Sequence, residues 1–341
     1  MEKKKLTLIF KNVEKVHLGK DVFLVPYYLK KINNFDTTIV CPLTDTNKEL
    51  ENEVKGIKIN KLNCSKLKKN SNKFYVKSKT IKYIIKNSRK IDVLASFHLH
   101  DGLLLLIFLY KIINPRGFVY IKSDAACRAL PDIVKGSSIK WNIKKLLFNK
   151  VDVISIEDKK TFDETNAIPF FRNKIILVPN GFDEDELSKF DLPIKDFSEK
   201  DKLIITVGRL GSREKNTEML LEAAKKIDLK DWKITLVGPI EKVEQDFQKT
   251  IDAFFVENPH LKDKILFTGN IDNKKDLWSY YNDSRVFVLT SPKEGFPIVF
   301  PEAYRFKNYI ISTDVGGVND IIHNGYGEVI NSADELANSL Q

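Results

Sequence analysis

The stretch LIITVGRLGSREKNTEMLLEAAKKIDLKDWKITLVG, from Leu203 to Gly238, decides the fold by the order of its apolar patterns. Its two ends, 203–207 and 233–237, are short runs rich in β-branched residues, which favour strands. Between them, residues 215–227 space their apolar side chains as one face of a helix requires. A strand, a helix and a second strand in this order predict a βαβ unit with parallel strands.

The same alternation continues in both directions along the 341-residue chain. Two consecutive series of this kind predict an α/β protein with two Rossmann-like, doubly wound parallel-sheet domains. The turn Val178-Pro179-Asn180-Gly181 predicts the boundary between them, with domains at 1–180 and 181–341. Further strands are expected at 6–10, 37–41, 57–62, 93–97, 118–121, 151–156, 175–178, 265–268, 286–289 and 309–312, and helices at 101–113, 138–148, 159–166, 242–257, 274–281, 297–306 and 318–322.

Charge is divided unequally between the two halves. Residues 1–150 hold 31 Lys and Arg against 12 Asp and Glu, whereas residues 151–341 hold 25 against 34. Such an asymmetry indicates different partners for the two domains, the first facing an anionic one. Residues 54–91 contain 13 basic residues and no acidic one, and Ile81, Ile84 and Ile85 fit one helical face there. This segment predicts contact with an anionic membrane surface, or else a core-facing helix with a solvated basic side.

Signals for other classes of protein are weak. Three widely spaced cysteines, Cys41, Cys64 and Cys127, match neither a disulfide framework nor a zinc site. The start has no signal-peptide pattern, and the most apolar run, 103–113, is too short for a bilayer span. Specific nucleic-acid binding is not expected, because no recognised motif accompanies the basic charge. We expect a cytoplasmic protein, peripheral on the inner face of the cell membrane.

Two loops that follow strands carry the residues suited to binding and catalysis. Arg209 and Lys215 flank the loop after the strand at 203–207, where a guanidinium and an ammonium suit a diphosphate. Glu294 lies in the turn Glu294-Gly295-Phe296-Pro297, with Pro297 expected as the first residue of a helix. Glu302 follows in that helix, so two carboxylates can grip different hydroxyl groups of one ligand. An ordinary solvated loop remains the alternative for Arg209 and Lys215 taken alone.

The ordered set of motifs resembles the retaining, nucleotide-sugar-dependent family-4 glycosyltransferases of the GT-B fold, whose two domains face each other across a cleft. The resemblance covers 175–330, and the seven-residue gap between the two glutamates is its most specific part. Its motifs are Pro179-Asn180-Gly181, Val207-Gly208-Arg209 with Lys215, Leu236-Val237-Gly238, Phe267-Thr268-Gly269, Glu294-Gly295-Phe296-Pro297 with Glu302, and Asp314-Val315-Gly316-Gly317.

The resemblance implies a role for each matching position. Arg209 and Lys215 would hold the diphosphate of the donor, Glu294 the transferred sugar, and Glu302 the ribose hydroxyls. His100 would contact the donor sugar from the first domain, and Gly19 would approach the phosphates in place of the family's glycine-rich loop. The reaction would need no metal and no obligatory cofactor besides the donor substrate. The residues expected around the donor are Gly19, Gly208, Gly238, Gly269, Asn270, Ile271, Gly295, Phe296, Pro297, Ile298 and Glu302.

Three other segments carry expectations of their own. The triplet Asp183-Glu184-Asp185 is interpreted as the acidic first turn of a helix and not as a metal site. Lys122 follows a strand of the first domain and could line the acceptor site or a surface loop. Family members end with a helix that crosses back to the first domain, and here only one helical pattern, 333–340, precedes Gln341. A short or missing crossover helix is therefore expected.

The function that these observations favour is transfer of a sugar from a nucleotide diphosphate sugar, with a UDP-sugar first, to a glycan or lipid-linked acceptor in surface polysaccharide or glycolipid assembly. A GT-B epimerase or phosphorylase is one alternative, and analysis of the products would distinguish it. A non-catalytic nucleotide-sugar-binding or scaffold subunit is the other, and donor hydrolysis would argue against it.

Overall fold

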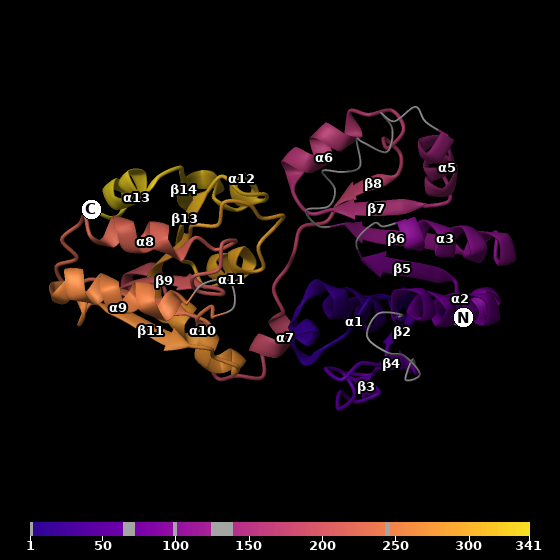
Figure 1. Ribbon diagram of the computed structural model, residues 1–341, viewed down its shortest axis with the longest axis horizontal. Coiled ribbons are helices and arrows are strands. Elements are labelled where there is room, and N and C mark those ends of the chain that lie inside the picture. The colour runs from indigo at the N-terminus through magenta and orange to yellow at the C-terminus, as the bar shows by residue number, and fades with distance from the viewer. Residues whose placement is uncertain (1–2, 64–71, 98–100, 124–138, 243–245) are drawn as a thin grey trace. The chain divides into compact units, whose positions relative to one another are not determined.

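The computed structural model describes residues 3–63, 72–97, 101–123, 139–242 and 246–341 (Figure 1). The chain divides into two compact units, Met1–Pro179 and Asn180–Gln341. Each unit is an α/β body around a sheet of its own. None of the helices in the described ranges combines the length and the apolar content needed to cross a membrane.

The N-terminal unit is built on an eight-stranded sheet in the order β3-β4-β2-β1-β5-β6-β7-β8. All neighbouring strands are parallel except the short β3, which pairs antiparallel with β4 at one edge. Its strands are β1 (Lys5–Ile9), β2 (Asp36–Pro42), β3 (Glu53–Val54), β4 (Ile57–Leu62), β5 (Val93–Phe97), β6 (Phe118–Ser123), β7 (Val153–Ile156) and β8 (Ile175–Leu177). Its helices include α1 (Asp21–Asn33), α2 (Asn72–Asn87), α3 (Asp101–Ile113), α5 (Ile139–Phe148) and α6 (Lys159–Asn166).

The C-terminal unit has a six-stranded, all-parallel sheet in the order β11-β10-β9-β12-β13-β14. The chain starts in the middle at β9, moves outward to β11, and returns to the other side of β9 with β12. Its strands are β9 (Asp201–Val207), β10 (Lys233–Val237), β11 (Ile265–Gly269), β12 (Ser284–Leu289), β13 (Tyr309–Thr313) and β14 (Gly327–Ile330). Its helices are α7 (Glu184–Leu187), α8 (Thr217–Ala224), α9 (Phe247–Glu257), α10 (Lys274–Asp283), α11 (Val299–Arg305), α12 (Val318–Ile321) and α13 (Ala333–Leu340).

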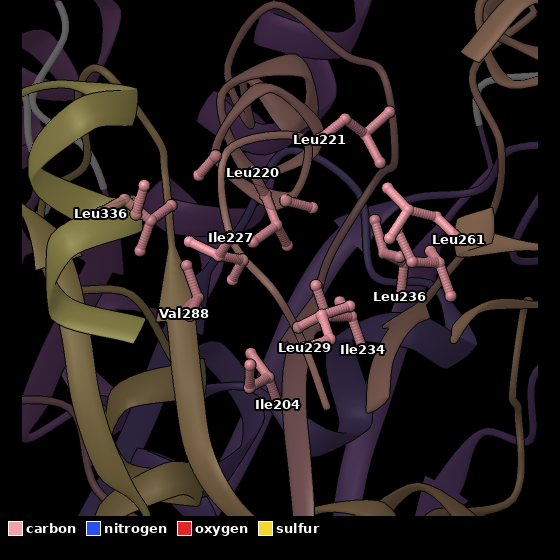
Figure 2. Close-up of a cluster of buried hydrophobic side chains, with 14 of the residues drawn as sticks. Ile204, Leu220, Leu221, Ile227, Leu229, Ile234, Leu236, Leu261, Val288 and Leu336 are labelled. Atoms are coloured by element: carbon pink, nitrogen blue, oxygen red, sulfur yellow. The ribbon is translucent and has the colours of Figure 1, made fainter. Parts of the chain in front are cut away.

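Successive residues of one strand belong to different cores, because side chains alternate between the two faces of a sheet. Ile204 packs in a cluster with side chains of α8, α9 and α13, part of which is drawn in Figure 2. The next residue, Ile205, packs in a cluster with side chains of α10 and α11. Both side chains are buried. The two-layered covering of the sheet therefore follows from the period of two within β9.

The N-terminal sheet is covered in the same way. Leu94 lies in a cluster with residues of α2, α3 and α5, whereas Ala95 lies in a cluster with residues of α1. Thus α2, α3 and α5 cover one face of this sheet and α1 covers the other.

Among the α-helices and strands that the structure describes, α1, β3 and β14 went unpredicted, each for a physical reason. Helix α1 contains Pro26, a residue that normally interrupts a helix, and β3 has only two residues. Strand β14 begins at a glycine, which weakens the apolar run by which a strand is recognised. The strand predicted from Val151 starts two residues later, at Val153, and Val151 is buried although it precedes the strand.

Candidate functional site

The carboxyl ends of β9 and β12 adjoin at the point where the strand order of the C-terminal sheet reverses. In doubly wound sheets, ligands bind at such a switch point. The loop after β9 contains Gly208, Arg209 and Lys215, and the loop after β12 contains Glu294. Lys215 and Glu294, which are 79 positions apart in the sequence, therefore lie at the same edge of one sheet.

Lys215 and Glu294 meet there. The Lys215 ammonium lies 2.6 Å from Oε1 of Glu294, and both side chains are about four-fifths buried, with 21% and 22% exposed. The hydroxyl of Ser291, itself buried, donates to the same carboxylate oxygen at 3.0 Å. Thr290 donates its hydroxyl to the backbone carbonyl of Lys215 at 2.9 Å, which ties the two loops together. The result is a neutral, partly accessible pair of opposite charges that an incoming ligand can separate.

The loop that carries Lys215 is held by a close approach of two backbones. Gly208 donates its N–H to the carbonyl of Val237 at 3.0 Å. Gly238, the residue after that strand, has φ of 140°, and a Cβ there would lie 1.8 Å from the carbonyl oxygen of Gly208. Only glycine fits, because both the dihedral angle and the space exclude a side chain. Gly208 and Gly238 thus let two backbone segments approach each other at the start of the loop that carries Lys215.

The turn that carries Glu294 is held from two sides. Gly316 donates its N–H to the Glu294 carbonyl at 3.3 Å, and a Cβ on Gly316 would lie 1.8 Å from the carbonyl oxygen of Gly295. From the other direction, Asn180 donates its side-chain amide to the carbonyl of Phe296 at 2.8 Å. Gly316 of the Asp314-Val315-Gly316-Gly317 motif and Asn180 of the interdomain motif therefore support this turn.

The prediction that Pro297 is the first residue of the helix is wrong. Helix α11 begins at Val299, with Ile298 at its N-cap. The carbonyl of Pro297 accepts the N–H of Phe300 at 3.1 Å, which closes one tight turn ahead of the helix. The turn therefore extends the loop by two residues before regular helical bonding starts.

Arg209 takes a different position from Lys215. Its guanidinium lies 3.3 Å from the carboxylate of Glu214, and more than half of each side chain is exposed, 56% and 54%. A surface ion pair of this kind is weak, so little free energy is needed to release the arginine toward an anion. The structure brings Lys215 and Glu294 together and leaves Arg209 beside them on the same loop.

Glu302 is buried in helix α11. Its carboxylate accepts hydrogen bonds from the indole of Trp278 and the phenol of Tyr281, each at 3.1 Å, and from the ammonium of Lys274 at 3.2 Å. Burial, and then the charge of Glu302, raises the pKa of Tyr281 well above its usual value, so its hydroxyl stays a donor. The Lys274 side chain is 38% exposed and forms the accessible end of this network.

Further predicted residues lie at the same edge of the sheet. Gly269 ends β11 with φ of 72° and accepts the N–H of Gly238 at 3.0 Å. Asn270 follows, exposed, and donates its amide to Asp272 at 2.8 Å, while Ile271 is half-buried.

The structure also shows the positions of the triplet Asp183-Glu184-Asp185 and of Lys122. Asp183 caps α7 by accepting the N–H of Glu186, so Glu184 and Asp185 are the acidic first turn of a helix, as predicted. Lys122 is buried, with its ammonium 2.9 Å from Glu157 and 3.5 Å from Asp21. These two carboxylates raise the pKa of Lys122 although burial lowers it. Lys122 is thus neither a surface-loop residue nor exposed toward an acceptor.

In the N-terminal unit, His100 lies outside the described residues, and Gly19 ends a short 3-10 helix, Lys15–Gly19, after β1. A polar network holds this loop. Asn12 accepts hydrogen bonds from Thr44 and from the buried Asn47, each at 3.0 Å. Sequence reasoning missed these residues, as it missed Ser291, Trp278 and Lys274, because single polar residues in loops carry no periodic signal. For Asn12 and Ser291, the one available signal was that they lie close to Gly19 and Glu294 in the sequence.

Comparison with known proteins now adds a family to this geometry. Residues 188–341 match the model for glycosyl transferases group 1. They form a group 1 glycosyl transferase domain. The family match thus concerns the C-terminal part of the chain, and the matched range contains every C-terminal residue of the candidate site from Gly208 to Glu302.

The chain is also similar in sequence to several curated bacterial proteins. An uncharacterized 41.2 kDa protein in the cps region of Klebsiella pneumoniae is 26% identical over 318 residues, which is 90% of this chain and 81% of the relative. The N-acetyl-alpha-D-glucosaminyl L-malate synthase of Bacillus anthracis is 27% identical over 188 residues, 54% of this chain and 47% of that protein. The amylovoran biosynthesis glycosyltransferase AmsD of Erwinia amylovora is 30% identical over 128 residues, 38% and 32% of the two chains.

Solved structures extend the likeness in fold to the whole chain. A glycosyltransferase from Rickettsia africae matches with a TM-score of 0.72 and 18% identity, covering 100% of this chain and 88% of that one. Anabaena HepE, in complex with UDP and glucose, matches with a TM-score of 0.69 and 15% identity, covering 99% and 89%. These likenesses concern the fold, which is GT-B, as predicted.

Proposed function

We propose that this glycosyltransferase transfers a sugar from a nucleotide diphosphate sugar, with retention of the anomeric configuration, to a glycan or lipid-linked acceptor in surface polysaccharide assembly. The observation that carries the proposal is the Lys215–Glu294 pair at the switch point of the C-terminal sheet. The similarity to an amylovoran biosynthesis glycosyltransferase supports the acceptor class, and the UDP bound to Anabaena HepE supports a UDP-sugar as donor.

The roles follow from the chemistry of each group. A diphosphate would compete with Glu294 for the Lys215 ammonium, and Arg209 can leave its surface ion pair to join it. Negative charge grows on the diphosphate as the bond to the sugar breaks, and these cations stabilise it. Glu294, released from Lys215, is then free to accept hydrogen bonds from hydroxyl groups of the sugar. The leaving phosphate takes the acceptor proton, so this step requires no separate protein base.

The remaining predicted residues complete the donor site in this proposal. The backbone of Gly295 and Phe296 faces the sugar, and 269–271 flank the base. Glu302 serves the ribose through the exposed end of its network at Lys274. His100 and Gly19 are proposed to act from the N-terminal unit. The protein works on the inner face of the cell membrane.

The test separates donor binding from transfer. We expect Lys215→Met to weaken UDP binding and to abolish transfer, because it removes the cation. Glu294→Gln should lower turnover by about 100-fold or more, while UDP binding is kept or strengthened, since Lys215 loses its competing carboxylate. Calorimetry with UDP and product analysis with a panel of nucleotide sugars measure the two effects.

Matched controls lie on the same unit. Lys249→Met and Glu257→Gln alter exposed side chains on α9, 82% and 68% exposed, and should leave both measurements unchanged. Near-normal turnover in Lys215→Met and Glu294→Gln would refute the site. UDP binding by the wild type without any transfer or donor hydrolysis would favour a scaffold subunit, and an epimerised nucleotide sugar would favour an epimerase.

A further inference from the structure

The outer side of the helical layer α2, α3 and α5 carries large apolar side chains in contact with solvent. Helix α2 packs beside α3, and α3 packs beside α5. In α3, Leu104 and Ile107 are buried against the sheet, whereas Leu105 and Ile112, seven residues apart, lie on the opposite side. We call the following set the α2–α3–α5 face: Ile85 (51% exposed), Leu105 (46%), Ile112 (59%), Ile143 (52%) and Leu146 (59%).

Cations accompany these side chains. Lys82 and Lys86 of α2 are exposed, and Lys144 and Lys145 of α5 are half-buried. Neither α2 nor α5 contains an acidic residue, and the one acidic residue of α3, Asp101, stands at its first position. The three helices therefore join aliphatic and positive groups with almost no negative charge.

Helix α2 alone cannot insert its apolar side into a membrane, as the basic segment 54–91 had suggested. Ile84 is fully buried, and Ile81 packs against the same core. The remainder of that segment includes β4, which is a strand of the sheet. Among the side chains of α2 that the structure describes, from Ser78 onward, Ile85 is the exposed large aliphatic one, and α3 and α5 supply further exposed apolar side chains.

We propose that the α2–α3–α5 face docks onto a lipid bilayer that contains anionic headgroups. Aliphatic side chains can enter the boundary between headgroups and acyl chains while lysines bind the phosphates. A nucleic acid would engage the lysines and leave the aliphatic groups in water. A second copy of the same face would bring like charges together. The inference deepens the proposed function by giving its membrane surface a location, and it rests on that function only for its use with a lipid-linked acceptor.

The experiment needs neither donor nor acceptor, so it can fail independently of the proposed activity. The full chain is sedimented with vesicles of phosphatidylcholine and with vesicles that contain 30% phosphatidylglycerol. We expect binding to the anionic vesicles that weakens as salt rises. The double variant Ile112→Asn/Leu146→Asn should lose binding at every salt concentration. Lys82→Gln/Lys86→Gln should bind about 30-fold more weakly at low salt, and the difference should shrink at high salt.

Controls are available on the other unit. Val256→Asn and Lys249→Gln replace side chains that are both 82% exposed on α9, and they should bind vesicles as the wild type does. Thermal unfolding of each variant checks that the fold is kept. Unchanged binding by both double variants would overturn the proposal. So would a dimer that Ile112→Asn/Leu146→Asn dissociates without any change in vesicle binding, because the face would then join two copies of the chain.

Discussion

The carboxylate of Glu302 accepts hydrogen bonds from two aromatic side chains and one ammonium. The same group therefore supplies a buried charge and the acceptor for these donors. Trp278 and Tyr281 are buried, and neither has water as an alternative partner. Removal of the carboxylate would leave two buried donors unsatisfied, each at a cost of about 1–3 kcal/mol. Glu302 therefore contributes to the stability of the C-terminal unit as well as to any ligand binding at Lys274.

We expect Glu302→Leu to lower the free energy of unfolding by about 2–5 kcal/mol, because both donors lose their acceptor. Urea denaturation followed by tryptophan fluorescence measures it. Glu257→Leu, at a side chain that is 68% exposed, should change the same quantity by less than about 0.5 kcal/mol. If both variants unfold at the wild-type midpoint, Glu302 has no structural role.

Lys200 is a buried cation that the proposed chemistry does not use. Its ammonium donates to the carbonyls of Tyr281 and Asn282, at 3.1 and 2.7 Å, at the end of α10. Burial lowers the pKa of Lys200 from 10.5 to about 8. The folded state thus favours the neutral form, and the unfolded chain binds more protons between these two values.

Stability from Lys200 should therefore rise as pH rises from about 8 to 10.5. We expect the melting temperature of the wild type to increase relative to Lys200→Met across this window, while below pH 8 their difference stays constant. Calorimetry at pH 7, 8, 9 and 10 measures the difference. The exposed Lys262→Met serves as the control and should show no such slope. A wild-type advantage that declines toward pH 10 would contradict the assignment.

At the level of elements, the candidate site consists of the loops after β9 and β12 and the segments that hydrogen-bond to these loops. Strand positions were predictable because β-branched runs such as 203–207 and 233–237 have few alternatives. The family resemblance implied that Lys215 and Glu294 bind one donor, but their contact was not predicted, since strand order is a property of the assembled sheet. The hydrogen bond by which Asn180 supports the Glu294 turn could not be predicted from the sequence either. It joins residues 116 positions apart.

Gly316→Ala should displace the Glu294 turn, because the new Cβ would lie 1.8 Å from the carbonyl oxygen of Gly295. A displacement near 1 Å at a substrate-positioning loop can reduce turnover by about 100-fold. Gly181→Ala is the matched control, since a Cβ there meets no atom within 4 Å. Steady-state kinetics measures both variants. Equal turnover in the two would show that the close contact at Gly316 does not position the turn.

For the whole molecule, the division into two units with separate cores governs the response to ligand. Met1–Pro179 and Asn180–Gln341 each have their own sheet and helical layers. A ligand that binds a folded unit stabilises it by mass action, by about 2.7 kcal/mol at one hundred times its dissociation constant. The basic surplus lies in the first unit and the Lys215–Glu294 pair in the second, so membrane and nucleotide effects should be separable.

UDP should therefore slow amide hydrogen exchange in β9, β12 and the two loops that follow them, more than in the edge strands β3 and β8. Mass spectrometry of peptic peptides with and without UDP gives the comparison. Lys215→Met, with its weakened binding, is the control and should show little protection at the same UDP concentration. Protection confined to the N-terminal sheet would place the nucleotide in the wrong unit.

The strand order of the C-terminal sheet also determines the order in which parts of this sheet can form while the chain is synthesised. Its central strand, β9, leaves the ribosome early, yet its neighbour β12 is completed only at Leu289. The partners Lys215 and Glu294 are separated by 79 residues, which translation covers in about 4–16 s. During that interval one edge of β9 is open, and a nascent chain at this stage offers chaperones an unpaired strand. The charge pair is accordingly among the late structures of its unit to form, and a chain released before β12 would expose a sheet edge in place of a binding site.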